Sequence, residues 1–342
     1  MKHLGHSVIE KQRLLLLQEV SKHLSKGQEY IVVDFPTYSN VGDSAIWLGM
    51  TKLLRAVSGR RPTLAVGQED LRNFALPDGP IFICGGGNFG DLWHKHQSYR
   101  YDLMKKYPHH QIIQMPQSIQ FTNENKIKEC RDAIKSHGNF HIMVRDKRSQ
   151  NFVRNELETE APLVPDCALF LGPLDVAADA RFHETLYMLR KDTEKRSYDL
   201  IDLMETLPGP VWDWLDEPTS TTKKSIPSLI LSALSGSYSR TAMKERHMEI
   251  VARRRFLRGQ KMLGSAERII TDRLHVHIMC ILMNIPHIAL DNSYGKIHGY
   301  IDEWMNDCNL VCKANDGSGV LEQIASLPYI NGGAWQFPSG AT

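Results

Sequence analysis

The feature that most constrains the fold is a short apolar strand followed by a polar loop and a helix, a unit that repeats along the chain. In the first half, strands are expected at 30–35, 80–84, 111–115 and 140–144, with helices between them. Short strands that alternate with helices favour a mostly parallel sheet covered on both faces. The sequence therefore predicts the α/β class.

The strand pattern restarts in the second half, at 186–190, 267–271 and 286–290. The chain has 342 residues, whereas one domain usually has about 100–200. We therefore expect two Rossmann-like domains, residues 1–175 and 182–330, that face each other across a cleft. Ligands of open parallel sheets bind at the carboxyl ends of the strands, near helix N-termini, so the cleft is the expected site.

The region 196–261 differs in composition from the rest of the second half. Residues 196–245 are rich in Ser, Thr and Pro, which predicts an insertion or mobile segment. The run from Lys244 to Lys261 is basic and has helical character. Most such runs are solvated faces, and contact with a membrane surface or a lipid diphosphate is the alternative.

Charge and cysteine content limit the class of protein. The formal net charge is +2, from 41 basic and 39 acidic side chains, so the strong basic excess of a nucleic-acid-coating protein is missing. None of the 6 cysteines forms a C-x-x-C pair, which disfavours a metal site. Cys84, Cys167 and Cys280 lie inside apolar runs, where a thiol behaves as a small core residue, which favours a reducing compartment. The first residues do not resemble a signal peptide, and no apolar run approaches the ~18 residues of a membrane span. We expect a cytoplasmic protein.

The glycine-rich segment 81–91, IFICGGGNFGD, is the strongest local motif. Four glycines after an apolar strand allow backbone amides to approach a ligand closely, and the next helix adds its positive end. The segment matches neither the Walker loop nor G-x-G-x-x-G. It predicts ligand contacts from Gly86, Gly87 and Asn88, with a tight strand-to-helix turn as the alternative.

The segment 40–44, NVGDS, also follows an apolar strand and opens a helix. Asp43 or Ser44 is expected to cap this helix. A substrate contact from Asn40, Gly42 or Asp43 is the second interpretation. A carboxylate near the cleft can orient or deprotonate a hydroxyl, so Asp43 is a candidate base.

The segment 271–277, TDRLHVH, ends a strand and begins a helix. Arg273 offers a planar fork for phosphate or carboxylate, and His275 exchanges a proton near neutral pH. Both would lie at a helix N-terminus, which favours anions. A structural Asp–Arg pair with a core histidine is the alternative. His277 points away from His275 on a helix and is expected to be structural, and a metal-binding H-x-H pair is disfavoured.

Weaker candidates lie at the ends of other strands. Arg145 follows the strand 140–144 and would hold a second anionic group, unless it belongs to a solvated charge run. Further residues that would line the cleft are Asp91, His94, His96, Gln117, Ser118, Arg190, Asp192 and Glu194.

Taken in order, five motifs resemble the polysaccharide pyruvyl transferase family. They are N-x-G-D at 40–43, G-G-G-N-x-G-D at 85–91, P-Q-S at 116–118, R-[DE]-x-x-S at 145–149 and T-D-R-L-H at 271–275. The resemblance implies an enzyme that transfers the enolpyruvyl group of phosphoenolpyruvate to two hydroxyls of a sugar, forming a pyruvate ketal in exopolysaccharide or capsule biosynthesis. It also implies a GT-B-like fold. Val276 departs from the family, in which many members have glycine.

The resemblance implies roles for the candidate residues. His275 is the expected acid–base group and Asp43 the acceptor-side base. The donor residues are Arg273, Leu274, Arg145, Gly86, Gly87 and Asn88. The acceptor residues are Asn40, Gly42, Asp91, His94, Gln117 and Ser118.

No cofactor or metal is expected beyond phosphoenolpyruvate as donor substrate. The acceptor would be a sugar or a lipid-linked oligosaccharide, the latter with peripheral contact at the inner face of the membrane. A GT-B nucleotide-sugar glycosyltransferase and a non-catalytic carbohydrate-binding protein remain alternatives.

Overall fold

The fold is known from a computed structural model. It describes residues 4–69, 76–175, 182–192, 196–198, 200–215, 240–292 and 295–328. The chain divides into two compact units. The N-terminal sheet unit comprises residues 12–171 and 217–255, and the C-terminal sheet unit comprises 1–11, 172–216 and 256–342. The sequence pattern predicts one division of the chain, near residue 175. The structure instead assigns residues 1–11 to the C-terminal sheet unit and residues 217–255 to the N-terminal sheet unit.

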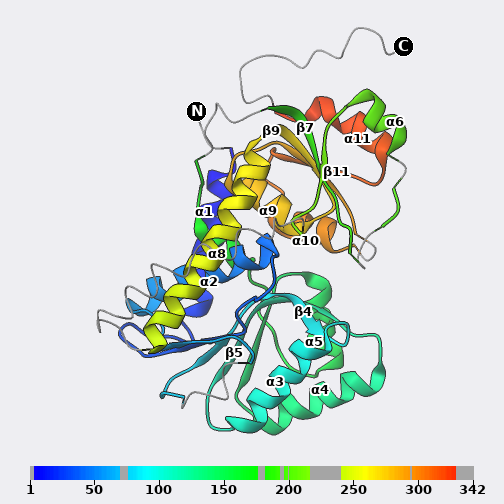
Figure 1. Ribbon diagram of the computed structural model, residues 1–342. Helices are drawn as coiled ribbons and strands as arrows, with labels where there is room; N and C mark the ends of the chain where they lie inside the picture. Colours follow the sequence, from blue (N-terminus) through cyan, green and yellow to red (C-terminus); the bar gives the residue numbers. More distant parts are fainter. Residues whose placement is uncertain are drawn as a thin grey trace. The chain divides into compact units, whose positions relative to one another are not determined.

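The N-terminal sheet unit is built on a parallel sheet of six strands (Figure 1). The strands are β1 (Ile31–Val33), β2 (Leu64–Ala65), β3 (Ile81–Ile83), β4 (Gly86–Gly90), β5 (Ile112–Gln120) and β6 (Phe140–Val144). β3 and β4 pair with successive parts of β5, while β6 pairs with β5 and β1 lies between β2 and β3. The sheet is therefore nearly continuous from β2 to β6, and its strands all end at one edge.

Helices connect these strands, as the alternating pattern predicts. They are α2 (Val41–Ser58), α3 (His94–Lys106), α4 (Glu124–His137) and α5 (Lys147–Glu156). Side chains of α3, α4 and α5 pack with Ile31, Ile81 and Ile112 in one buried apolar cluster. Asn123 caps α4 by accepting from the backbone N–H groups of Asn125 and Lys126.

The C-terminal sheet unit has a second parallel sheet, with strand order β11-β10-β9-β7-β8. Its strands are β7 (His183–Met188), β8 (Val211–Trp212), β9 (Ala266–Thr271), β10 (His287–Leu290) and β11 (Val311–Ala314). Its helices include α6 (Ile201–Thr206), α9 (Leu274–Leu282), α10 (Lys296–Trp304) and α11 (Gly317–Gln323). Two units with parallel sheets and connecting helices confirm the predicted α/β class.

The region predicted to be an insertion contributes to this second sheet. Its described part contains α6 and β8, and β8 pairs with β7. The prediction is therefore wrong for residues 200–215, while residues 216–239 lie outside the described residues. The basic run is helical, as predicted, within α8 (Arg240–Gly264). A further helix, α1 (His6–Val20), lies near the start of the chain.

Candidate functional site

Charged side chains gather in the C-terminal sheet unit where β7, β8 and β9 end. Arg273 is the N-cap residue of α9 and is 5% exposed. Its Nη2 donates to the carboxylate of Asp213 at 2.7 Å and to Oδ2 of Asp192 at 3.2 Å. Its buried Nε has no hydrogen-bond partner among the described residues. Arg273 is thus anchored on one side and keeps a donor that a ligand can use.

Asp192 connects Arg273 to a second arginine. Arg190 donates to Oδ1 of Asp192 through Nε at 2.9 Å and to Oδ2 through Nη2 at 3.2 Å. One carboxylate therefore lies between two guanidinium groups. The sequence suggested Arg190 and Asp192 as lining residues, and the structure brings both to Arg273. Glu194 lies outside the described residues.

Backbone contacts fix the strand ends around Arg273. Oγ1 of Thr271 accepts from the backbone N–H of Arg273 at 3.0 Å and donates to the carbonyl of Met188 at 2.7 Å. Asp272 accepts from the backbone N–H of Arg190 at 2.8 Å. Burial raises the pKa of Asp272 to about 6. Asp272 therefore holds the β7 loop rather than forming the structural pair with Arg273 considered from the sequence.

Leu274 and His275 form the first turn of α9. The side chain of Leu274 is buried, whereas that of His275 is partly exposed. The amino end of a helix carries partial positive charge and free N–H groups. His275 and Arg273 therefore share an electropositive helix end with access to solvent.

His277 is structural, as the sequence predicts. Its Nδ1 lies 2.7 Å from Nε2 of His287, and Nδ1 of His287 lies 3.0 Å from the carbonyl of Ile285. Burial lowers the pKa of both histidines, to about 4 for His287. The pair is neutral near pH 7. The described residues contain no group of three or more His, Cys, Asp and Glu side chains arranged to hold a metal.

In the N-terminal sheet unit, the loop after β1 leads into α2. Oδ1 of Asn40 accepts from the backbone N–H of Gly42 at 2.8 Å, so Asn40 is the cap. The expected cap by Asp43 or Ser44 is wrong, because Ser44 donates its hydroxyl to the carbonyl of Asn40 instead. Asp43 is partly exposed, and after burial its negative charge is the next cause that raises the pKa of Tyr38. Asp43 is therefore available at the sheet edge.

The glycine-rich segment is a strand and not the predicted loop. Gly86–Gly90 forms β4, which pairs with the second part of β5. At Gly90, φ is +134°, and a Cβ would lie 1.7 Å from the carbonyl oxygen of Gln120, so only glycine fits. Gly87 is partly exposed and Gly86 is buried. The close backbone approach thus serves strand pairing at Gly90.

Asn88 projects from β4 into a polar network. Its Oδ1 accepts from Nη2 of Arg100 at 2.6 Å and from Nε2 of Gln117 at 3.0 Å. Its Nδ2 lies 3.0 Å from Nδ1 of His96. Arg100 and Gln117 are both 0% exposed. The buried guanidinium sets the orientation of Asn88, which in turn directs an amide N–H toward His96.

His96 lies within a polar cluster that the sequence only partly revealed. Its Nδ1 is 3.2 Å from Oδ2 of Asp34 and 2.7 Å from Nε2 of Gln68. Gln68 also donates to Oδ1 of Asp34 at 2.7 Å. Asp34 is 3% exposed and has φ of +68°, a rare conformation outside glycine. Asp34 directly follows a buried strand, and this position is the signal that could have identified it.

Asp91 and His94 lie near this cluster in sequence but differ in environment. Oδ2 of Asp91 accepts from the backbone N–H groups of Thr122 and Asn123, at 2.7 and 2.8 Å. These bonds tie β4 to the loop after β5, which is a structural role. His94 is exposed at the first position of α3.

Arg145, directly after β6, bonds to Ser118, a partly exposed residue of β5. Arg145 is 0% exposed, so the solvated charge run is excluded for this residue. Its Nε donates to Oγ of Ser118 at 2.9 Å, and its Nη1 donates to Oδ2 of Asp166 at 2.5 Å. Much of the fork expected to bind an anion therefore contacts the protein itself.

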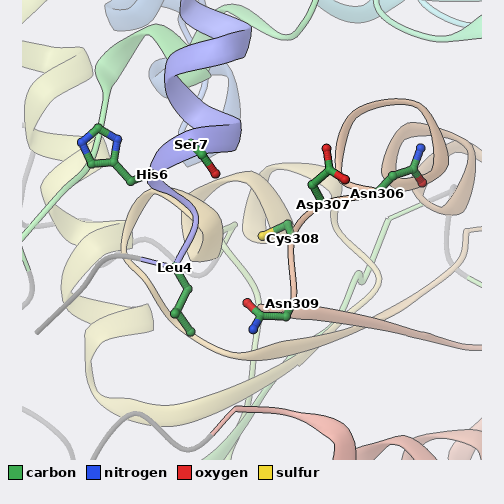
Figure 2. A pocket seen from close by; sticks show the side chains of 7 residues that line it. All are labelled: Leu4, His6, Ser7, Asn306, Asp307, Cys308 and Asn309. Carbon is green, nitrogen blue, oxygen red and sulfur yellow. The ribbon is translucent and has the colours of Figure 1, made fainter.

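A separate pocket of about 800 Å³ lies in the C-terminal sheet unit (Figure 2). It is lined by Leu4, His6, Ser7, Asn306, Asp307, Cys308 and Asn309. None of the residues predicted for the site contributes to it.

Comparison with known proteins tests the resemblance carried by the motifs. The family described as polysaccharide pyruvyl transferase matches residues 40–294, which is most of the chain. This chain belongs to that family. The matched range includes all five motifs and every site residue predicted from the sequence.

Individual relatives agree with the family assignment. A Bacillus subtilis protein provisionally named pyruvyl transferase EpsO is 29% identical over 314 residues, covering 88% of this chain and 92% of its own. Pyruvyl transferase 1 of Schizosaccharomyces pombe is 28% identical over 327 residues, covering 89% and 76%. General stress protein 30 of Bacillus subtilis is 26% identical over 292 residues, covering 81% and 78%.

A solved structure supports the fold alone. The crystal structure of an uncharacterised Klebsiella pneumoniae protein superposes with a TM-score of 0.55 at 17% identity, covering 92% of this chain and 100% of that chain. Among the described residues, no helix has the length and apolar character needed to span a membrane.

Proposed function

We propose that this chain transfers the pyruvyl group of phosphoenolpyruvate to two hydroxyls of a sugar and forms a cyclic pyruvate ketal. The observation that carries the proposal is the first turn of α9. There Arg273, 5% exposed, keeps a buried Nε without a partner among the described residues, two positions before the accessible His275. Membership of the family supports transferase activity with a polysaccharide acceptor.

The donor has two anionic groups, a phosphate and a carboxylate. A buried guanidinium at the positive end of a helix is suited to bind one of them. We assign this role to Arg273, with Leu274 beside it. Gly86, Gly87 and Asn88 remain proposed donor residues, and the partly exposed Gly87 offers its backbone.

The reaction requires proton transfer at both substrates. An acid protonates the methylene carbon of the donor, which leaves positive character at C2, and a sugar hydroxyl attacks C2 while a base takes its proton. The second hydroxyl then attacks C2 and closes the ketal while the C2–O bond to phosphate breaks, and the proton of this hydroxyl leaves with the phosphate. His275 is the proposed acid because it is accessible and lies at the anion site. Asp43 is the proposed base for the attacking hydroxyl.

The acceptor side is proposed to involve the loop before α2 and the start of α3. Asn40 and Gly42 shape the loop that presents Asp43, and His94 is exposed at the first position of α3. Gln117 and Ser118 are proposed to act indirectly, since Gln117 bonds Asn88 and Ser118 bonds Arg145. Asp91 supports the same strand end through its bonds to the backbone.

The cellular setting follows from the proposed acceptor. A sugar polymer for export is commonly assembled on a lipid carrier, so a role in exopolysaccharide or capsule biosynthesis places the enzyme at the inner face of the membrane. Arg253 and Arg254 of α8 are exposed and basic, which suits contact with an anionic surface. We propose a cytoplasmic enzyme with peripheral membrane contact.

The direct test is to incubate the purified protein with phosphoenolpyruvate and a panel of simple β-galactosides, glucosides and mannosides. Acceptor-dependent phosphate release with the mass gain of a pyruvate ketal is the expected result. A thermal-shift titration measures donor binding independently, because a ligand that binds only the folded state stabilises it. Stabilisation by a nucleotide sugar and none by phosphoenolpyruvate would favour a glycosyltransferase. Sugar binding without turnover of any donor would favour a carbohydrate-binding protein.

A further inference from the structure

Two carboxylates contact Arg273, and they differ in environment. The side chain of Asp213 is 0% exposed, whereas that of Asp192 is 27% exposed. Asp213 also accepts from the backbone N–H of Lys191 at 2.9 Å, which fixes it within the fold. Asp213 is therefore a permanent partner of Arg273, and Asp192 is the partner at the solvent side.

Asp192 occupies the position that an anionic ligand would take. Its two oxygens accept from Nε and Nη2 of Arg190 and from Nη2 of Arg273, at 2.9 to 3.2 Å. Paired guanidinium groups around a carboxylate form a typical phosphate or carboxylate site. The buried Nε of Arg273, which has no partner among the described residues, is an independent sign that a ligand contacts this guanidinium.

We propose that Arg190 is a second anion-binding residue of the donor site, and that Asp192 holds the place of a donor anionic group until the donor displaces it. The ligand class is a small phosphorylated carboxylic acid, whose two anionic groups match two guanidinium groups. The inference deepens the proposed function and rests on it for the identity of the donor. It also supplies a second arginine within the C-terminal sheet unit.

The proposal predicts that replacing the two carboxylates changes the affinity for phosphoenolpyruvate in opposite directions. Asp192→Asn keeps the size of the side chain but removes the competing charge, so phosphoenolpyruvate should bind about tenfold more tightly, which corresponds to about 1.4 kcal/mol. Asp213→Asn should weaken binding, because it loosens the anchor of Arg273. Arg190→Gln should weaken binding by about tenfold or more, since a charge-assisted contact is lost. Asp202→Asn, an exposed site on α6, is the matched control and should change nothing.

The measurement is isothermal titration of the full-length protein with phosphoenolpyruvate and, separately, with inorganic phosphate. Tighter binding of either probe by Asp192→Asn supports the proposal that Asp192 occupies the anion site until the donor displaces it. Unchanged or weaker binding of both probes overturns it, as does an Arg190→Gln variant with wild-type affinity. If the affinities of the variants for phosphate change as expected and phosphoenolpyruvate does not bind, the proposed role of Asp192 is supported and the proposed donor is wrong. If neither probe binds the wild type or Asp192→Asn, both proposals fail.

Discussion

Nη1 of Arg145 donates to Oδ2 of Asp166 at 2.5 Å, and the two side chains are 1% and 0% exposed. The other carboxylate oxygen of Asp166 accepts from the backbone N–H of Ala168 at 2.8 Å. The pair therefore links the end of β6 to the 3-10 helix η2 (Cys167–Leu171), which follows Asp166. Removing one partner of a buried pair leaves a charge without compensation, which is costly.

Replacement of Arg145 should accordingly act first on stability. Arg145→Ala is expected to lower the free energy of unfolding by about 3–5 kcal/mol, measured by urea denaturation. The double variant Arg145→Met/Asp166→Leu should recover most of this loss, because no charge is left buried. If the refolded double variant binds phosphoenolpyruvate like the wild type, the predicted donor role of Arg145 is wrong. Lost affinity in a stable double variant would support that role.

The predicted and observed environments of Arg145 show which properties of a site residue can be predicted from sequence. Its place after a strand was predicted, because apolar runs and turn residues mark strand ends. Its burial was not, because Asp166 is distant in sequence and no local pattern pairs them. Asp213 was missed because it lies in a segment whose Ser, Thr and Pro content suggested an insertion, and its partner Arg273 is also distant in sequence. Side-chain partners depend on tertiary contacts that one sequence does not encode locally.

Strand positions were predicted more accurately than loop conformations. Phe140–Val144 was predicted at its observed bounds, and α9 begins within the segment 271–277 that was predicted to end a strand and begin a helix. Gly86–Gly90 was taken for a loop, since glycine usually interrupts a strand. Pairing with β5 outweighs that preference, and Gly90 is needed where the backbones approach.

The accessible position of His275 predicts a specific kinetic defect. His275→Gln should reduce turnover by about 10²–10⁴-fold, the usual contribution of a general acid or base. The dissociation constant of phosphoenolpyruvate should change by less than threefold, because the guanidinium of Arg273 is untouched. Steady-state kinetics and titration of the same preparation separate the two effects. His109→Gln, an exposed site far from α9 in sequence, is the control. Near-normal turnover by His275→Gln would rule out the acid–base assignment.

The buried pair of His277 and His287 predicts sensitivity to acid. Burial lowers both folded-state pKa values, to about 4 for His287, whereas an unfolded histidine has its ordinary value of about 6.5. Between these values the unfolded state binds a proton that the folded state excludes. The stabilising contribution is therefore complete above pH 6.5 and is lost as the pH falls toward 4.

Urea denaturation between pH 7 and pH 4 should show this loss. Each histidine adds up to about 1.4 kcal/mol per pH unit to the slope of the unfolding free energy. His287→Gln keeps hydrogen-bonding groups and removes one titrating ring, so its slope should be shallower by up to that amount. The exposed His109→Gln should leave the slope unchanged. Equal slopes in His287→Gln and the wild type would show that the pair does not titrate as described.

Two helical glycines predict opposite responses to the same substitution. A Cβ on Gly49 in α2 would lie 2.0 Å from the carbonyl oxygen of Cys167, and backbone cannot move aside cheaply. Gly49→Ala should destabilise the protein by about 1–3 kcal/mol through overpacking. A Cβ on Gly299 in α10 meets nothing within 4 Å. Gly299→Ala should stabilise by about 0.5–1 kcal/mol, because alanine is the better helix former. Thermal unfolding of the two variants measures both, and a destabilising Gly299→Ala would contradict the open surface at α10.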